Sequence, residues 1–201
     1  IDILAKDGSV LKKGQIIFEG RDLMALSEKE MREIRGREIS MVFQNPMSSM
    51  NPVKTIGKQI TEVLEKRLGM DRGSARLRAI ELIESVGIPD PERQLGRFPM
   101  NLSGGMRQRI SIAIALAAEP KLLIADEPTT SLDVTIQAQI LELLRRQQIE
   151  RKMALILVTH DLGIVANYAD DIVVMYAGQI VESCATGPLI RRPRMPYTKA
   201  L

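Results

Sequence analysis

Residues 122–128 have the sequence Leu-Leu-Ile-Ala-Asp-Glu-Pro, and this stretch decides the fold. Its uninterrupted apolar run is typical of a parallel strand that is covered on both faces. Asp126 and Glu127 follow at the carboxyl end of that strand, where open α/β sheets bind their ligands. Adjacent carboxylates are unfavourable there unless a cation or a proton transfer uses them, and phosphoryl transfer needs both. The pair therefore predicts a catalytic edge; the alternative is two acids that open a loop or cap the next helix.

The sequence on both sides of this strand predicts the other strands and helices of an α/β sheet. Residues 155–158 form a second apolar run, expected to be a strand covered in the same way. Between the two runs, apolar residues recur at helical spacing, which predicts a strand–helix–strand crossover; they are Ile136, Ile140, Leu143 and Leu144. Further strands are expected at residues 15–19 and 39–43, helices at 27–36, 55–68, 73–86 and 103–118, a loop at 45–52, and a hairpin at 171–184 that turns at Ala177-Gly178. We therefore expect an α/β core interrupted by a helical insertion at residues 45–118.

Composition limits the classes of function. The 201 residues include 28 Lys and Arg, 25 Asp and Glu, one His and one Cys, and 45% are hydrophobic. This balance is that of a folded globular protein, and a single Cys excludes a disulfide framework or a Cys-based metal site within the chain. The longest uncharged apolar run, residues 110–118, is too short to span a bilayer, and a net charge of +3 is too small to indicate nucleic-acid binding. We expect Arg191-Arg-Pro-Arg194 to be a solvated basic tail.

A glycine-rich stretch, Leu102-Ser-Gly-Gly-Met-Arg-Gln-Arg109, opens the apolar helix. Ser103 can cap this helix, and Gly104 and Gly105 allow the backbone to approach an anion without an intervening side chain. The free N–H groups and the positive dipole end of a helix N-terminus suit a phosphate. A plain Ser-Gly-Gly turn explains only part of the stretch, so we favour a phosphate-binding role.

Five motifs together resemble those of the ABC (ATP-binding-cassette) ATPases. Residues 102–109 are similar to the family's signature motif, residues 122–127 to its Walker B strand, and residues 131–133 (Ser-Leu-Asp) to its D-loop. Gln44 and His160 each follow a predicted strand where the family has its Q-loop glutamine and its switch histidine. The resemblance implies an α/β, P-loop NTPase-like (RecA-like) fold with a mostly parallel sheet core and a helical ABC-specific subdomain. Residues 1–44 and 119–201 would form the nucleotide-binding core, and residues 45–118 the helical subdomain with the signature motif.

The resemblance also implies ATP and Mg²⁺ as cofactors and a role for each matching residue. Glu127 would be the general base that activates water, and His160 would contact the γ-phosphate. Asp126 would hold Mg²⁺, directly or through water, while Gln44 would contact Mg²⁺ or the water and report the nucleotide state to membrane subunits. The remaining residues would act across a dimer: Ser103, Gly104, Gly105 and Gln108 would contact ATP on a second cassette, and Asp133 would couple the two sites.

Finer similarities point to one branch of the family. Residues 26–36, 43–52 and 133–139, and the ending Pro196-Tyr-Thr-Lys-Ala-Leu201, resemble the ATPase subunits of bacterial oligopeptide, dipeptide and nickel importers. This implies the ATP-hydrolysing motor subunit of an importer for peptides or a related solute. Its partners would be a second ABC ATPase subunit, identical or a sister, two transmembrane permease subunits and, indirectly, an extracytoplasmic solute-binding protein, without nucleic acid. It would lie at the cytoplasmic face of a bacterial or archaeal cell membrane, and the loop after Gln44 would carry the docking groove.

One motif of the family is missing from the sequence. No Gly-x-x-x-x-Gly-Lys-Ser/Thr occurs, and the one Gly-Lys pair, Gly57-Lys58, is followed by Gln59. Because this P-loop cradles the β- and γ-phosphates, we expect the chain alone to bind ATP poorly and not to hydrolyse it. The family places the P-loop upstream, and residues 1–13 contain neither a helix start nor a clear strand, so we expect a fragment. Asn45, Met100 and Met195 also depart from the importer pattern, which weakens the assignment of the solute.

Two other functions remain open at this point. A truncated or degenerate cassette would complete the ATP site of a partner without catalysis; the missing P-loop favours this function, while the intact Glu127 and His160 oppose it. A soluble ABC ATPase acting on nucleic acid or ribosomes would require basic arms, tandem cassettes or a coiled-coil insertion, and the sequence contains none of these.

Overall fold

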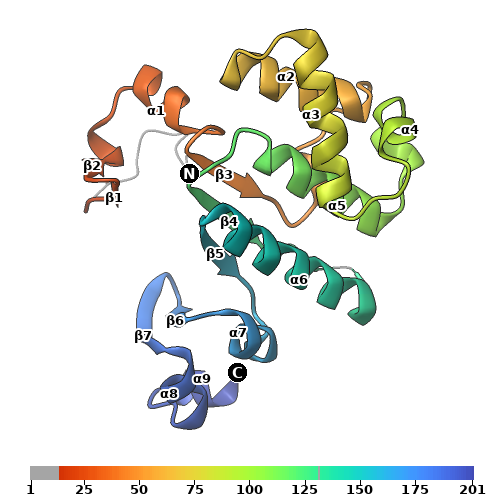
Figure 1. Cartoon of the computed structure of the whole chain (residues 1–201). Coiled ribbons are helices and arrows are strands. Elements are labelled where there is room, and N and C mark those ends of the chain that lie inside the picture. Colours follow the sequence, from red (N-terminus) through yellow and green to blue (C-terminus); the bar gives the residue numbers. More distant parts are fainter. Residues whose placement is uncertain (1–13, 131) are drawn as a thin grey trace.

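A three-stranded parallel sheet lies at the centre of the molecule. The computed structural model describes residues 14–130 and 132–201, so the expectations for residues 1–13 and for Ser131 lie outside the described residues. The sheet has the order β3 (Ile39–Val42), β4 (Leu122–Asp126), β5 (Ala154–Val158), with Met41, Ile124 and Ile156 aligned across it. Helix α6 (Val134–Arg151) connects β4 to β5 (Figure 1). The predicted parallel strands and their helical crossover are therefore confirmed.

Only one face of this sheet is fully covered. Val42, Leu123 and Ala125 point to the face beneath α5 (Gly104–Leu116) and α6 and are completely buried. On the opposite face, Ile156 is 49% and Val158 44% exposed. The prediction that the apolar run at residues 155–158 is covered on both faces is wrong, because both of the packed helices lie on the same side. Successive side chains of a strand point to opposite faces, so the uncovered face stays open along every second residue.

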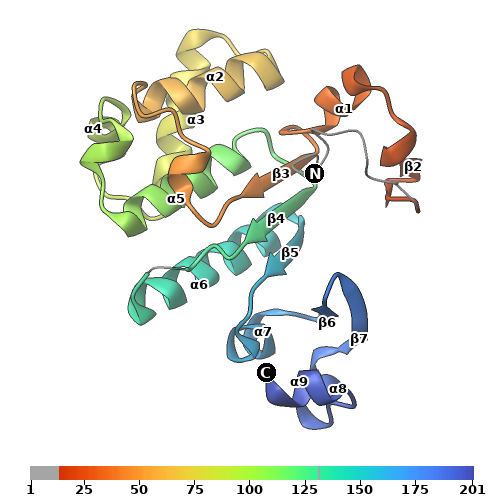
Figure 2. The same ribbon diagram turned by 180° about the vertical axis from the view of Figure 1, so that it is seen from behind.

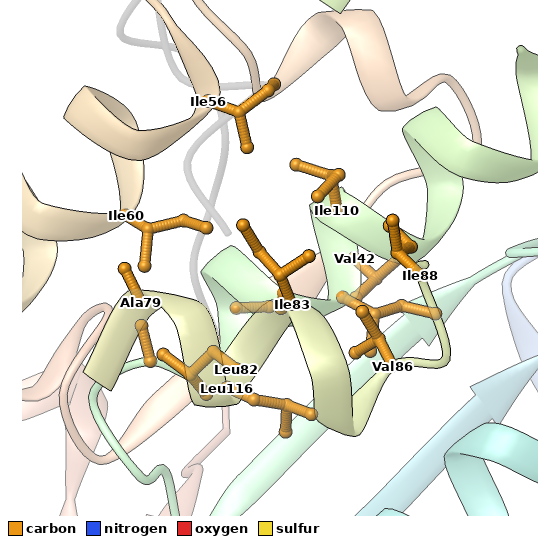
Figure 3. Packing of buried hydrophobic residues seen from close by; sticks show 14 of the residues in the cluster. Val42, Ile56, Ile60, Ala79, Leu82, Ile83, Val86, Ile88, Ile110 and Leu116 are labelled. Carbon is orange, nitrogen blue, oxygen red and sulfur yellow. The ribbon is translucent and has the colours of Figure 1, made fainter. Parts of the chain in front are cut away.

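The helices after β3 form a lobe beside the sheet. This lobe contains α2 (Ile56–Leu68), α3 (Arg72–Ser85), α4 (Pro91–Leu95) and α5. Their apolar faces meet in one continuous core, in which Ile60, Ile83 and Ile110 are fully buried (Figure 3). The helices predicted at residues 55–68, 73–86 and 103–118 are confirmed. Helix α4 was not predicted, although Pro91 stands at its first position, where proline is tolerated. The division into units at residues 45 and 118 stays a prediction.

Short elements at the N-terminal side lie next to the sheet. β1 (Ile17–Phe18) pairs antiparallel with β2 (Arg21–Asp22), and α1 (Glu28–Ile34) follows. The predicted strand at residues 15–19 is therefore only two residues long. Helix α1 begins as predicted with a capping box, in which Ser27 and Glu30 each bind the backbone N–H of the other. Three single 3₁₀ turns complete this description: Leu23–Ala25, Pro46–Ser48 and Pro99–Asn101.

The C-terminal elements form a group of their own beyond β5. After α7 (Leu162–Tyr168), the strands β6 (Asp171–Tyr176) and β7 (Gln179–Ala185) form the predicted hairpin, followed by α8 (Thr186–Arg191) and α9 (Pro196–Ala200). Ala177 and Gly178 both have positive φ, as a two-residue hairpin turn requires. Figure 2 shows this group and the helical lobe on opposite sides of the central sheet. Among the described residues, none of the helices combines the length and apolar character needed to cross a bilayer.

Candidate functional site

The ends of three neighbouring strands bring Gln44, Glu127 and His160 together. Gln44 lies two residues after β3, Glu127 directly after β4, and His160 two residues after β5. Because parallel strands point the same way, their carboxyl ends lie at one edge of the sheet. This explains how residues separated by 83 and 33 positions in the sequence come into contact.

The carboxylate of Glu127 is the centre of this cluster. Its Oε2 accepts hydrogen bonds from Gln44 Nε2 at 3.0 Å and from Thr130 Oγ1 at 2.8 Å. Its Oε1 lies 3.2 Å from Nδ1 of His160, whose side chain is 75% exposed. A carboxylate has about four lone pairs that can accept hydrogen bonds. Three contacts therefore leave one acceptor position, and it is on Oε1.

These contacts also set the protonation state of Glu127. The hydrogen bond from Thr130, and then that from His160, hold the pKa of Glu127 below its usual value, although partial burial opposes the shift. Hydrogen bonds to the charged form of an acid favour that form. Glu127 is therefore an ionised carboxylate near neutral pH, as an acceptor of a proton must be.

The backbone of Glu127 is fixed as firmly as its side chain. Its φ is +43°, in the left-handed region that residues other than glycine seldom occupy. The N–H of Glu127 donates to the carbonyl of Val158 at 2.9 Å, which extends the pairing of β4 with β5. The N–H of Thr130 donates to the carbonyl of Glu127 at 3.2 Å and closes a turn. Thr130 was not predicted as a site residue, although the sequence places its hydroxyl three residues after Glu127, within reach of that carboxylate.

Asp126 and Gln44 are the residues that fit a divalent cation. Asp126 is the last residue of β4, and no hydrogen bond or ion pair engages its side chain among the described residues. Gln44 donates to Glu127 through Nε2, which leaves its amide oxygen free. One carboxylate and one amide oxygen are hard ligands of the kind that Mg²⁺ accepts together with waters and phosphates. The described residues contain no group of three or more His, Cys, Asp or Glu that would hold a metal by itself.

The remaining predicted site residues lie at the N-termini of α5 and α6. Ser103 caps α5 by accepting from the N–H of Met106 at 3.3 Å, and Asp133 caps α6 by accepting from the N–H of Ile136 at 2.9 Å. A Cβ atom on Gly105 would lie 3.0 Å from Ile136, so this glycine permits close packing of the two helices. Structural needs therefore account for part of what the sequence attributed to phosphate binding.

Gln108 differs from its expected place. Its side chain is only 2% exposed and its Nε2 has no hydrogen-bond partner among the described residues. It points into the protein because it lies on the inner side of α5, so in this conformation it is not presented to a ligand at the surface. The site thus consists of two parts: Gln44, Asp126, Glu127 and His160 at the sheet edge, and Ser103, Gly104, Gly105 and Asp133 at the two helix N-termini. In residues 14–130 and 132–201, no hydrogen bond or ion pair joins these parts.

The fold is that of an ATP-binding cassette. A solved dimeric cassette, in a post-hydrolysis state bound to ADP and Pi, superposes with a TM-score of 0.77 at 27% identity, covering 87% of this chain and 74% of that one. The match defines a P-loop NTPase-like α/β fold, as predicted. The sequence profile of the family described as ABC transporter matches residues 2–130. The chain belongs to the ABC transporter family.

Two relatives support the predicted resemblance to peptide importers. The oligopeptide transport ATP-binding protein OppD of Bacillus subtilis is 59% identical over 190 residues, which are 94% of this chain and 53% of that protein. The dipeptide transport ATP-binding protein DppD of Escherichia coli is 54% identical over 184 residues, covering 92% of this chain and 56% of that protein. The chain thus spans little more than half the length of these relatives.

Proposed function

We propose that the protein containing this chain is the ATP-hydrolysing subunit of an importer for peptides or a related solute. The observation that carries the proposal is the convergence of Gln44, Glu127 and His160 at one sheet edge. The names of OppD and DppD describe transport of oligopeptides and dipeptides, and the similarity to them supports the solute class.

Hydrolysis would use the free acceptor position on Glu127. As a water molecule attacks the γ-phosphorus of ATP, Glu127 Oε1 takes one proton of that water, the bond between the γ-phosphorus and the bridging oxygen breaks, and ADP leaves. His160, oriented by its contact with Oε1, would donate from its other ring nitrogen to a γ-phosphate oxygen when both ring nitrogens carry a proton. Asp126 and Gln44 would hold Mg²⁺, which, when bound, neutralises charge on the phosphate oxygens.

A second cassette would complete the site. The helix N-termini with Ser103 and Asp133 are not bonded to the Glu127 cluster, and free N–H groups at such an end suit a phosphate. We therefore propose that Ser103, Gly104 and Gly105 contact ATP held by a partner cassette and that Asp133 couples the two sites. The dimeric solved cassette supports this arrangement.

Two permease subunits would dock beside the loop that follows Gln44, at the cytoplasmic side of the membrane. The buried side chain of Gln59 fixes the end of this loop. Its Oε1 accepts the backbone N–H of Asn51 at 2.8 Å, and its Nε2 donates to the carbonyls of Asn51 and Lys54. A hollow of about 300 Å³, lined in part by Ser49 and Asn51 of this loop, lies next to it. Val53, which directly follows the loop, is 80% exposed. Exchanging residues 45–52 for an unrelated loop should uncouple transport while nucleotide binding persists. Transport at the original rate would contradict the docking role.

The substitution Glu127→Gln tests the catalytic proposal. It removes the proton acceptor but keeps the size of the side chain, so ATP turnover by the protein that contains this chain should fall about 10²–10⁴-fold while ATP remains bound. Glu142→Gln is the matched control, because Glu142 is an exposed acid on α6. Normal turnover in Glu127→Gln would remove Glu127 as the base.

The second candidate function is a non-catalytic cassette that completes the ATP site of a partner; the helix N-termini at Ser103 and Asp133, which are not bonded to the Glu127 cluster, would suffice for it. Under that alternative, the protein would hydrolyse no ATP by itself but would stimulate hydrolysis by a partner cassette. In that case Ser103→Ala would abolish the stimulation and Glu127→Gln would leave it unchanged. This pattern separates the two functions.

A further inference from the structure

The C-terminal group of elements encloses a hollow that the proposed function does not use. It lies between strand β7 and the segment that runs from α8 to α9, with a volume of about 1110 Å³. Four basic side chains line it: Arg191, Arg192, Arg194 and Lys199. We call this hollow the basic pocket. In Figure 1 these elements lie together, apart from the helical lobe.

The basic residues belong to a folded wall and not to a loose tail. Leu189, on the same helix as Arg191, is buried against Ile172 and Val174 of the hairpin. The carboxylate of Glu182 on β7 accepts the backbone N–H of Arg194 at 2.9 Å and that of Met195 at 3.2 Å. The expected solvated tail is therefore attached to the hairpin through its backbone, although its basic side chains are exposed.

The positive charge of the basic pocket is only partly compensated. Glu182 is the one acid that lines it; its carboxylate accepts the backbone N–H groups of Arg194 and Met195 and also attracts the charge of Arg194. Among the described residues, none of the four basic side chains has an ion pair or a side-chain hydrogen bond. Some basic residues elsewhere in the chain are paired, as Lys54 is with Glu62 and Arg78 with Glu119. Clefts lined by one sign of charge concentrate ions of the opposite sign.

We propose that the basic pocket binds a phosphorylated ligand that carries at least two negative charges. Guanidinium groups match phosphate oxygens in paired hydrogen bonds, and three of the four cations are arginines. The volume exceeds that of a single phosphate and lies just above the range of about 300–1,000 Å³ that is typical of sites for small organic ligands. Pro188 and Met195 add an apolar wall for the rest of such a ligand, and the Ser183 hydroxyl adds a polar contact. The same chemistry is found in a soluble diphosphate and in a phosphorylated lipid headgroup.

Calorimetric titration of the full chain with inorganic pyrophosphate tests the proposal. A variant with Arg191→Gln, Arg192→Gln and Arg194→Gln should bind pyrophosphate at least about tenfold more weakly, because hydrogen bonds from charged donors are lost. The control carries Arg72→Gln, Arg76→Gln and Arg93→Gln, three exposed arginines of α3 and α4. Both variants lose the same charge, so a general electrostatic effect would weaken binding equally in both. Equal affinity of the two variants would overturn the proposal.

A variant with lysine at the three pocket positions separates geometry from charge. It keeps every charge but loses the planar guanidinium groups, so its affinity for pyrophosphate should lie between those of the wild type and the glutamine variant.

Sedimentation with phosphatidylcholine vesicles, with and without phosphatidylinositol phosphate, distinguishes a lipid headgroup from a soluble ligand. Binding to the anionic vesicles that pyrophosphate displaces indicates a headgroup, and binding of pyrophosphate alone indicates a soluble ligand. Tighter binding of an acidic peptide or an RNA, lost in the pocket variant, would replace the phosphorylated small ligand by that class.

Discussion

Glu127 combines an unusual backbone with a side chain that makes three polar contacts. Its φ of +43° is unfavourable for a residue with a Cβ atom, yet ladder and turn hydrogen bonds hold it there. Such strain tends to persist where it positions a functional group. Here it directs the carboxylate away from the line of β4, to where Gln44, Thr130 and His160 reach it. The geometry of the proposed base thus depends on a turn of four residues, 127–130.

Thr130→Val tests the contribution of the hydroxyl within this turn. Removing its hydrogen bond should raise the pKa of Glu127 toward the ordinary value of 4.5, because that bond is the main cause of the lowering. Since the folded-state pKa is the lower one, the stabilisation by Glu127 is present above the ordinary value and is lost as the pH falls through the lowered pKa. In the variant, the stabilisation should be smaller and its loss should be complete at higher pH. Carbon-detected NMR titration of the glutamate carboxyls measures the shift.

The control for this experiment is Thr130→Ser, which keeps the hydroxyl and should keep the lowered pKa. Identical pKa values for Glu127 in the valine variant and the wild type would show that His160 and Gln44 suffice to hold the carboxylate.

Helix contacts in the lobe depend on a glycine at a crowded position. Helix α2 meets α4 at Gly57, where an added Cβ atom would lie 2.9 Å from the carbonyl oxygen of Leu95 and 3.0 Å from its Cβ. The neighbour is backbone, which cannot turn aside as a flexible side chain would. The contact matters for function, because α2 also carries Gln59, which holds the proposed docking loop.

Gly57→Ala should destabilise the protein by about 1–3 kcal/mol, since the crowding outweighs the better helix propensity of alanine. Gly96→Ala is the control, because no atom lies within 4 Å of the added Cβ and the φ of Gly96 is −84°. Denaturant unfolding, compared with the wild type, gives both values. Equal stability of the two variants would mean that α2 and α4 move apart readily.

At the scale of the whole molecule, the layers of the sheet are unequal. Helices α5 and α6 bury one face, which is continuous with the core of the lobe. The opposite face of β5 is open, and the outer sides of the hairpin also expose apolar residues, among them Met175 and Ile180. Among the described residues, the larger of the two buried apolar clusters therefore joins the core of the lobe to the covered face of the sheet.

Alanine substitutions on the two faces should differ strongly in their effect. Leu123→Ala empties a fully buried position beneath the helices and should reduce the free energy of unfolding by about 2–5 kcal/mol. Ile156→Ala, on the open face, should reduce it by less than about 1.5 kcal/mol, since half of that side chain is already in contact with solvent. Urea unfolding of the full chain measures both. A loss at Ile156 as large as that at Leu123 would indicate that the open face is covered in solution.

Local patterns in the sequence were sufficient for most of the elements. The apolar run at residues 122–125, the capping pair Ser27 and Glu30, and the hairpin turn Ala177-Gly178 were predicted because each depends on interactions within a few residues. The same reasoning placed Asp126 and Glu127 at the end of a strand, whereas Gln44 and His160 were identified through the family resemblance. That Gln44, Glu127 and His160 come into contact at one edge was shown by the structure.

The amino-acid sequence alone therefore predicts the order of the elements, the family resemblance and the identity of the residues at the strand ends. The folded structure was needed to show that Thr130 binds Glu127, that Gln108 is buried, that one face of β5 is open, and that four basic side chains line one pocket. The physical reason is the range of the interactions. Periodicity, caps and turns act between near neighbours along the chain. Burial and charge compensation depend on which distant segments pack against each other, and that is a property of the whole fold.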